Sequence, residues 1–277
     1  MPTFNQGRVQ SLLFVPGDRP ERFDKALGSG ACSIIVDLED AVAPGAKMKA
    51  REIVSSWASG ERPVLLRING RGTPWFADDL ALRELPGVAG IVLPKTESSD
   101  DVSQVTDGVG RNIDVYPLIE TAAGMSNVRE IVSTRGVRQL LFGTLDFQVD
   151  MNIQGDAEEL DAYRASLVLA SKVAGIRAPI DGVTPAIDDP ERIARDALNS
   201  KRRGFAGKLC IHPKQVPIVN AVFRPSEAEL DWARRVLAAV AESRGAVVSV
   251  DGKMVDRPVV LQAEQILVTS GGIGHAA

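Results

Sequence analysis

Short apolar runs rich in β-branched residues recur along the chain, and segments of helical composition separate them. Near-continuous apolar runs are typical of parallel strands that are covered on both faces. Segments 46–58 and 165–175, between such runs, have helical spacing and composition. The strand-like runs lie at residues 11–17, 33–40, 63–70, 90–97, 114–120, 138–146, 180–185 and 207–213.

Eight such units predict an α/β fold of the TIM-barrel type, a (β/α)₈ barrel. A doubly wound sheet is the alternative, but no G-x-G-x-x-G follows the first run, which weakens a dinucleotide-binding interpretation. In a barrel we expect the active site at the carboxyl ends of the strands.

The chain changes character after the eighth run. Residues 224–245 predict a long amphipathic helix, in which Ser226 and Glu229 have the spacing of a capping box. Residues 246–267 predict a hairpin or short strand pair followed by a helix. We therefore expect a barrel over residues 1–223 and a dependent helix and lid segment over residues 224–277.

Composition and charge narrow the classes of function. The chain has 277 residues, 44% of them hydrophobic, and a net charge of −4 with acids and bases interspersed, which argues against a nucleic-acid surface. The amino terminus lacks the apolar core of a secretory signal, and no run approaches the roughly 18 apolar residues that span a bilayer. Cys32 and Cys210 both lie in apolar runs and are expected to be buried thiols in a reducing cytoplasm.

The histidines limit the chemistry further. Only His212 and His275 are present, and His275 lies in the glycine-rich tail. A multi-histidine zinc site is therefore excluded, and a Ser-His-Asp hydrolase is disfavoured. We interpret His212, which precedes Pro213 at a strand end, as a structural histidine. The chemistry must then use carboxylates, arginines and lysines.

Polar residues follow nearly every predicted strand, although the strands themselves are apolar. A purely structural barrel does not need this arrangement. The residues at these positions are Asp37, Glu39, Asp40, Arg67, Asn69, Lys95, Glu97, Glu120, Asp146 and His212.

Glu120 and Asp146 follow adjacent strands, so their carboxylates can converge at the barrel mouth. Two carboxylates, with water and substrate oxygens completing an octahedron, suit Mg²⁺. Either residue alone is equally explained as a helix cap or an arginine partner. Gly124 and Gly143 lie beside them and permit close backbone approach, so the pair together favours a metal site.

Two cations at the strand ends have competing interpretations. Arg67 can pair with Asp37 or Asp40, and its guanidinium can also hold a substrate carboxylate or stabilise an enolate oxygen. Lys95 can form a Schiff base, or can be a solvated or ion-paired lysine beside Glu97.

The loop after the first run predicts the start of a helix. Asp18 and Glu21 have the spacing of a capping box. The same helix start carries Arg19 and Lys25 and opens at the predicted catalytic face. Such an end suits an anionic group such as a phosphate.

Several of these segments together resemble the citrate lyase β-subunit-like branch of the HpcH/HpaI aldolase family. The ordered set covers residues 11 to 260, nearly the whole chain. The segments are SLLFVPGDRPERFDKA, DLEDAV, LLRING, LPKTE, LIETAAG, FGTLDF, GKLCIHPKQV and DGKMVDRPV.

The resemblance implies a TIM barrel that binds Mg²⁺ through Glu120 and Asp146 and cleaves a carbon–carbon bond in a 3-hydroxyacyl thioester such as malyl-CoA, citramalyl-CoA or a citryl thioester. The products are an acyl thioester and a 2-oxoacid. Substrate contacts are implied for Arg67, Glu120, Gly143 and Thr144. Arg19 and Lys25 are the candidates for the CoA phosphates, and a homotrimer or hexamer is expected.

One departure from the family pattern concerns the residue before SLLFVPG. Relatives often have arginine there, whereas this chain has Gln10, with Arg8 as a possible substitute in holding a CoA phosphate.

Asp256 is a second catalytic candidate. It lies between apolar Met254–Val255 and Pro258–Val260, and we expect partial burial to raise its pKa toward that of a general acid. The resemblance implies that this residue lies on a lid over a neighbouring subunit's barrel and protonates the enolate carbon.

Three alternatives remain open from the sequence. The first is a malyl-thioester hydrolase or synthase that uses the same scaffold. The second is a metal-free Schiff-base aldolase that uses Lys95. The third is a non-catalytic barrel that binds acyl carriers within a larger lyase complex.

Overall fold

The computed structural model describes residues 10–107, 110, 112–243 and 248–269. The chain forms two compact units that divide between Phe223 and Arg224. Each unit is described by itself. No helix within the described ranges is long and apolar enough to cross a membrane.

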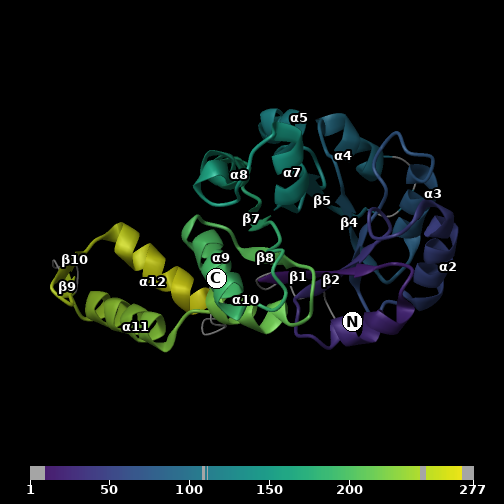
Figure 1. The fold of residues 1–277 in the computed structure, drawn as a ribbon. Coiled ribbons are helices and arrows are strands. Elements are labelled where there is room, and N and C mark those ends of the chain that lie inside the picture. Colours follow the sequence, from purple (N-terminus) through teal and green to yellow (C-terminus); the bar gives the residue numbers. More distant parts are fainter. Residues whose placement is uncertain (1–9, 108–109, 111, 244–247, 270–277) are drawn as a thin grey trace. The chain divides into compact units, whose positions relative to one another are not determined.

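The first unit is built around a closed barrel of eight parallel strands, which confirms the predicted (β/α)₈ fold (Figure 1). The strand β1 pairs with β2 on one side and with β8 on the other, so that Leu12 lies opposite both Ser33 and Leu209. The strands are β1 (Ser11–Pro16), β2 (Ser33–Asp37), β3 (Val64–Arg67), β4 (Val88–Leu93), β5 (Asp114–Ile119), β6 (Gln139–Phe142), β7 (Arg177–Asp181) and β8 (Gly207–Cys210).

The strands are apolar along their length because successive side chains enter two different cores. Leu12, Leu65 and Leu141 belong to the cluster that fills the barrel. Their neighbours Leu13 and Leu66 belong to the cluster between the barrel and the helices. Both kinds of position are buried, so the period-two alternation of a half-exposed sheet does not develop.

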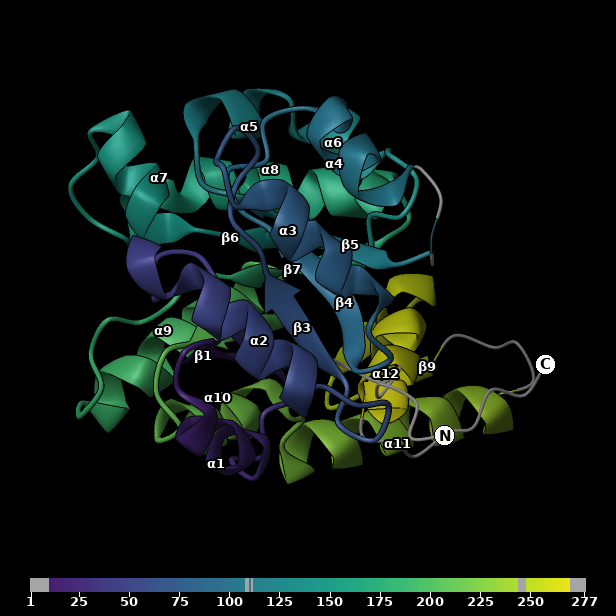
Figure 2. The ribbon, with the colours of Figure 1, turned by 90° about the vertical axis from the view of Figure 1, so that its right-hand side faces the viewer.

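The helices lie around the outside of the strands, as Figures 1 and 2 show. The predicted helix at residues 46–58 is observed, and the segment 165–175 lies mostly within another helix. The α-helices of this unit are α1 (Phe23–Leu27), α2 (Lys47–Trp57), α3 (Phe76–Ala81), α4 (Ser99–Thr106), α5 (Ala122–Ser126), α6 (Val128–Val132), α7 (Thr144–Met151), α8 (Asp161–Val173), α9 (Pro190–Arg202) and α10 (Gln215–Phe223).

A buried ion network joins α8 and α9 to the seventh and eighth strands. Arg164 Nε donates to both carboxylate oxygens of Asp181, at 3.1 and 3.2 Å, and the Ser200 hydroxyl also donates to Asp181. Lys208 Nζ donates to the Gly182 carbonyl at 2.6 Å. Burial alone would raise the pKa of Asp181, but the charges of Lys208 and Arg164 and the hydrogen bonds hold it below its usual value.

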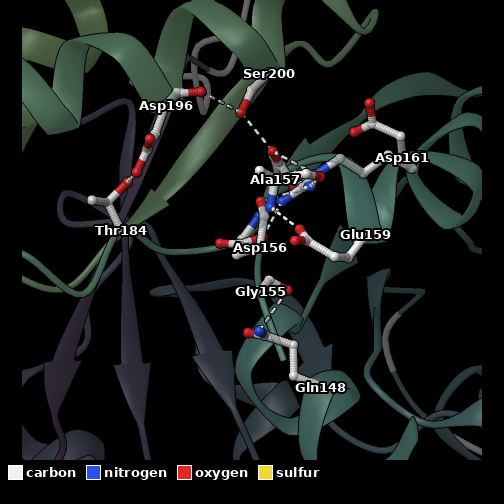
Figure 3. Close-up of polar contacts among 12 residues, drawn as sticks. Gln148, Gly155, Asp156, Ala157, Glu159, Asp161, Thr184, Asp196 and Ser200 are labelled. Carbon is white, nitrogen blue, oxygen red and sulfur yellow. Dashed lines mark hydrogen bonds and ion pairs between the residues drawn. The ribbon is translucent and has the colours of Figure 1, made fainter. Parts of the chain in front are cut away.

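The loop before α8 supplies backbone carbonyls that accept hydrogen bonds from Arg164. Arg164 Nη1 donates to the carbonyls of Asp156 and Ala157, each at 3.1 Å. Figure 3 shows Asp156, Ala157 and Ser200 gathered around these contacts, with Thr184 bonded to Asp196 nearby. Because every buried charge has an opposite partner, the network fixes the helix positions without leaving a charge unpaired.

The second unit contains α11 (Glu227–Glu242), β9 (Val248–Val250), β10 (Lys253–Val255) and α12 (Arg257–Thr269). The predicted capping box is confirmed, since the Ser226 hydroxyl accepts from the Glu229 N–H and the Glu229 carboxylate accepts from the Ser226 N–H. The hairpin turns through Asp251 and Gly252, with φ of 51° and 74°. An Asp-Gly pair suits this two-residue turn because both positions need left-handed backbone.

Neither cysteine forms a disulfide within the described part of the chain. Cys210 is buried, as predicted, and burial raises its pKa to about 12. The prediction of full burial is wrong for Cys32, which is only partly buried. It lies just before β2, where its sulfur accepts a hydrogen bond from the Gln10 N–H at 3.2 Å.

Candidate active site

A cavity of about 500 Å³ opens at the carboxyl ends of the barrel strands. It brings Arg67, Glu120, Gly143, Thr144 and Asp146 together. The other lining residues are Phe14, Pro16, Asp37, Asp40, Ala41, Leu118, Phe142, Leu145, Val183, Leu209 and Ile211.

Glu120 directly follows β5 and is almost fully buried. Its Oε1 accepts the backbone N–H of Lys95 at 2.8 Å. Burial raises the pKa of Glu120 to about 8, and the negative charges of Glu39 and Asp146 add to this effect. A cation bound nearby would stabilise the ionised form of this buried carboxylate.

Asp146 is the second carboxylate of the cavity. It lies in the first turn of α7, immediately after β6, and is exposed. The two carboxylates follow neighbouring strands and line one cavity, and such a pair of oxygen donors suits a hard divalent cation such as Mg²⁺. No group of three His, Cys, Asp or Glu side chains that could hold a metal is found among the described residues.

Gly143 makes room for the Glu120 side chain. A β-carbon at this position would lie 2.4 Å from Glu120 Oε2 and 2.6 Å from Glu120 Cβ. Gly143 has φ of −86°, so the position requires glycine for space and not for backbone conformation. Gly124 permits a close backbone approach as expected, and its neighbour is the backbone of Thr96, since a β-carbon there would lie 2.4 Å from the Thr96 carbonyl oxygen.

We expect Gly143→Ala to displace the Glu120 carboxylate and to weaken Mn²⁺ binding by about ten-fold or more. The same overlap should lower the free energy of unfolding by about 1–3 kcal/mol. Metal titration monitored by electron paramagnetic resonance and chemical denaturation measure the two effects. Gly70→Ala is the matched control, because a β-carbon at Gly70 meets nothing within 4 Å. Equal behaviour of the two variants would contradict the packing argument.

Thr144 is the other small polar residue in the wall. Its side chain is buried and Oγ1 has no hydrogen-bond partner within the described structure. Gly182, just after β7, packs so closely that a β-carbon there would lie 2.2 Å from this oxygen. Thr144 therefore contributes to the cavity wall, while its hydroxyl oxygen lies close to Gly182.

Arg67 ends β3 and lies opposite Asp37 of β2 in the sheet register. Its Nε and Nη2 donate to the two oxygens of Asp37 at 2.7 and 2.6 Å, and its Nη1 lies 3.1 Å from Glu39 Oε2. Burial alone would lower the pKa of Arg67, but the hydrogen bonds and charges of Asp37 and Glu39 raise it. The ion pair anticipated from the sequence is therefore present with Asp37. The ion pair with Asp37 uses two of the five N–H donors of the guanidinium, so further N–H groups remain to bind a ligand.

Lys95 is an ion-paired lysine. Its Nζ lies 3.1 Å from Glu39 Oε1. Burial would lower its pKa, but Glu39 and, to a smaller extent, Asp40 and Glu120 raise it above the ordinary value. A Schiff-base lysine needs a depressed pKa to supply the neutral amine, so these surroundings favour the ion-paired interpretation.

His212 has the local bonds of a structural residue. Its ring Nδ1 accepts the backbone N–H of Lys214 at 3.2 Å, and the backbone N–H of His212 donates to the side-chain oxygen of Gln215. Arg8 and His275 lie outside the described residues. Gln10 is described, and its carbonyl accepts from the Lys208 N–H at 2.9 Å.

The predicted capping box at Asp18 is wrong. The first turn is a 3₁₀ helix, Pro20–Arg22, whose N-cap is Arg19, and it has no side-chain cap. Pro20 occupies the first helical position, so the helix starts one residue later than the spacing suggested. Arg19 and Lys25 are exposed and do not line the cavity, and α1 has only five residues.

Asp256 lies in the second unit. The predicted partial burial is wrong for the single chain, because the side chain is exposed. Its Oδ1 accepts the Val259 N–H at 3.2 Å, at the start of α12. The neighbouring Val255 and Val259 pack within the second unit, so the apolar sequence around Asp256 does not enclose its carboxylate.

Sequence reasoning missed the buried cluster of Arg164, Asp181 and Lys208. Its members are separated along the chain and follow no motif, although a charged residue inside an apolar strand, such as Lys208, was a usable signal.

Comparisons with known proteins identify the family of the chain. Residues 10–213 match the family described as HpcH/HpaI aldolase/citrate lyase, and residues 168–272 match a carbon–carbon bond lyase family of the TIM-barrel fold. A citrate lyase subunit β-like protein of Deinococcus radiodurans is 34% identical, with 94% of this chain and 96% of that protein covered. A (3S)-malyl-CoA thioesterase of Cereibacter sphaeroides is also 34% identical, with 95% of each chain covered.

Solved structures give the same result. The crystal structure of CitE from Mycobacterium tuberculosis, in complex with magnesium, acetoacetate and coenzyme A, has a TM-score of 0.84 and 33% identity over 97% of this chain and 99% of that one. The resemblance seen in the ordered motifs is thus confirmed. The chain belongs to the HpcH/HpaI aldolase/citrate lyase family.

Proposed function

We propose that the chain is a Mg²⁺-dependent lyase that cleaves a 3-hydroxyacyl-CoA thioester of the malyl or citramalyl type. The observation that carries the proposal is the convergence of Glu120, Asp146 and Arg67 on one cavity at the carboxyl ends of the strands. Relatives crystallised with magnesium and coenzyme A, or with magnesium and oxaloacetate, support the same class of ligands.

The reaction is a retro-Claisen cleavage. The bond between the second and third carbons of the acyl chain breaks, and the hydroxyl on the third carbon loses its proton and becomes the carbonyl of a 2-oxoacid. The bonding electrons pass to the thioester as an enolate, which is then protonated on carbon. Bound Mg²⁺ would supply Lewis-acid stabilisation of the substrate oxygens.

The residues of the chain would divide the remaining tasks. Glu120 and Asp146 would hold the cation, and Arg67, fixed by Asp37, would stabilise oxyanion charge. Gly143 and Thr144 would line the part of the cavity that takes the 2-oxoacid end. Phe14, Leu118 and Phe142 supply an apolar wall, which would strengthen these interactions once a substrate has displaced water from the cavity.

A product assay with purified protein, Mg²⁺ and malyl-CoA or citramalyl-CoA tests the proposal. A lyase releases a 2-oxoacid, which phenylhydrazine detects, and an acyl thioester without free thiol. A hydrolase, favoured by the similarity to the Cereibacter enzyme, releases free CoA thiol without the 2-oxoacid. A synthase that hydrolyses the same intermediate would condense the 2-oxoacid with the acyl thioester and release thiol.

Two controls separate the remaining alternatives. EDTA should abolish lyase activity, and borohydride with pyruvate should trap no adduct at Lys95. Absence of any product from free CoA thioesters would favour the acyl-carrier-binding subunit.

The protonation step is assigned to Asp256 of a neighbouring subunit, as part of the same proposal. We expect inactive Glu120→Ala and inactive Asp256→Ala proteins to regain activity when they are refolded together. If the chains form a ring, each site combines the barrel of one chain with the lid of its neighbour. When the two variants are mixed at random in equal amounts, roughly a quarter of the sites have both Glu120 and Asp256 intact. Turnover of the mixed oligomer measures this fraction. No recovery despite demonstrated subunit exchange would show that the sites are not shared.

A further inference from the structure

The turn after β4 has an unusual backbone. Lys95 has φ of +47°, although it is not glycine. The left-handed region places the β-carbon close to the following carbonyl, so side chains other than those of asparagine and aspartate seldom adopt it. Such a conformation persists only where the surrounding structure holds it.

Contacts on both sides hold this turn. The Thr96 hydroxyl donates to the Leu93 carbonyl at 2.7 Å, and the Thr96 N–H lies 3.4 Å from the Leu118 carbonyl oxygen. Gly124 packs so closely against the Thr96 carbonyl that a β-carbon would lie 2.4 Å from its oxygen. The backbone conformation of Lys95 is thus supported by contacts of the residue that follows it, Thr96, with Leu93, Leu118 and Gly124.

The left-handed turn gives Lys95 two contacts at once. Its backbone N–H donates to Glu120 Oε1 at 2.8 Å, and its Nζ reaches Glu39 Oε1 at 3.1 Å. Glu39 in turn lies 3.1 Å from Arg67. Lys95 therefore contacts both Glu120, which is assigned to the metal, and Glu39, which lies beside the Arg67 guanidinium.

We propose that Lys95 is a positioning residue, whose backbone N–H, held in the left-handed turn, donates to Glu120 Oε1 and so fixes the rotation of the metal-binding carboxylate. The inference rests on the proposed function, since it assigns Glu120 to the metal. A carboxylate that is free to rotate must lose that freedom on binding a cation. A backbone donor fixed by the fold removes this cost, and such outer contacts commonly change metal affinity by about 10- to 100-fold.

Two substitutions separate the backbone from the ammonium group. Lys95→Asn removes the ammonium but keeps a side chain that tolerates φ near +50°, whereas Lys95→Val removes the ammonium and also disfavours this backbone. We expect Mn²⁺ affinity, titrated on metal-free full-length protein, to fall by about ten-fold or more in Lys95→Val and by less than about three-fold in Lys95→Asn.

Asn152→Val is the matched control. Asn152 has φ of 53° at the end of α7, and it does not line the cavity. This variant should lose stability as Lys95→Val does, yet keep the wild-type Mn²⁺ affinity. Equal losses of affinity in Lys95→Val and Lys95→Asn would assign the effect to the ammonium group and overturn the backbone role.

Hydrogen exchange of the Lys95 amide tests the contact without any metal. We expect this amide to be protected in metal-free wild type and in Asp146→Ala, and to exchange about ten-fold faster or more in Glu120→Ala. An amide that exchanges equally fast in all three proteins would overturn the inference. Absence of Mn²⁺ binding by wild type would overturn the proposed function and this inference with it. Normal binding by both wild type and Lys95→Val would overturn the positioning role alone.

Discussion

Asp146→Ala is expected to abolish Mg²⁺-dependent turnover, and Glu120→Ala is expected to do the same. Each variant removes one of two protein ligands from the proposed cation site. Lewis-acid stabilisation by a bound metal contributes several kcal/mol, so turnover should fall by about 1,000-fold or more. Steady-state kinetics at saturating Mg²⁺ and direct titration with Mn²⁺ measure the two consequences.

The fold should survive both substitutions, because neither side chain belongs to an apolar cluster. Asp100→Ala is the matched control. Asp100 lies in the first turn of α4, as Asp146 does in α7, is exposed, and does not line the cavity. It should keep metal affinity and turnover. Unchanged metal affinity in Asp146→Ala would refute the assignment of that residue.

Arg67→Lys is the second substitution with a large expected effect. Lysine keeps the positive charge but cannot hold both oxygens of Asp37 and also present further donors to the cavity. We expect turnover to fall by about ten-fold or more, and Arg67→Ala to be worse, because an oxyanion donor is lost. Separate measurements of kcat and KM show whether the loss falls on the chemical step.

A loss of stability must be separated from a loss of catalysis, since Arg67 also neutralises a buried carboxylate. Arg51 provides the control. Its Nη1 pairs with the fully buried Asp79 at 3.1 Å, and it lies outside the cavity. Arg51→Lys and Arg67→Lys should lower the unfolding temperature to a similar extent, but only Arg67→Lys should impair turnover. Near-wild-type kinetics of Arg67→Lys would leave Arg67 with a salt-bridge role alone.

Local features of the sequence determined the barrel and the approximate position of the site. The strands were recognisable because the barrel interior and the helical layer bury both sides of each one, which leaves continuous apolar runs. The Ser226–Glu229 box was predictable because its partners lie three residues apart. Glu120 and Asp146 were found because strand ends of a parallel barrel meet at one face.

Features that depend on two distant segments needed the tertiary structure. The choice of Asp37 as the partner of Arg67 follows from strand register across 30 residues. The space that Gly143 leaves for Glu120, and the Lys95 amide that binds it, also join separate strand ends. The pattern of apolar residues along the sequence cannot predict these contacts, because each one depends on the register between adjacent strands.

Two predictions from local spacing or neighbours were wrong, for different reasons. Asp18 has the spacing of a cap, but Pro20 occupies the first helical position, so Arg19 is the N-cap. Asp256 has apolar neighbours in sequence, but their side chains pack within the second unit while its carboxylate faces solvent. Sequence alone determined which residue types occupy the ends of the barrel strands. Only the tertiary structure decided which of them touch, because burial and pairing are set by packing between segments and not by adjacency along the chain.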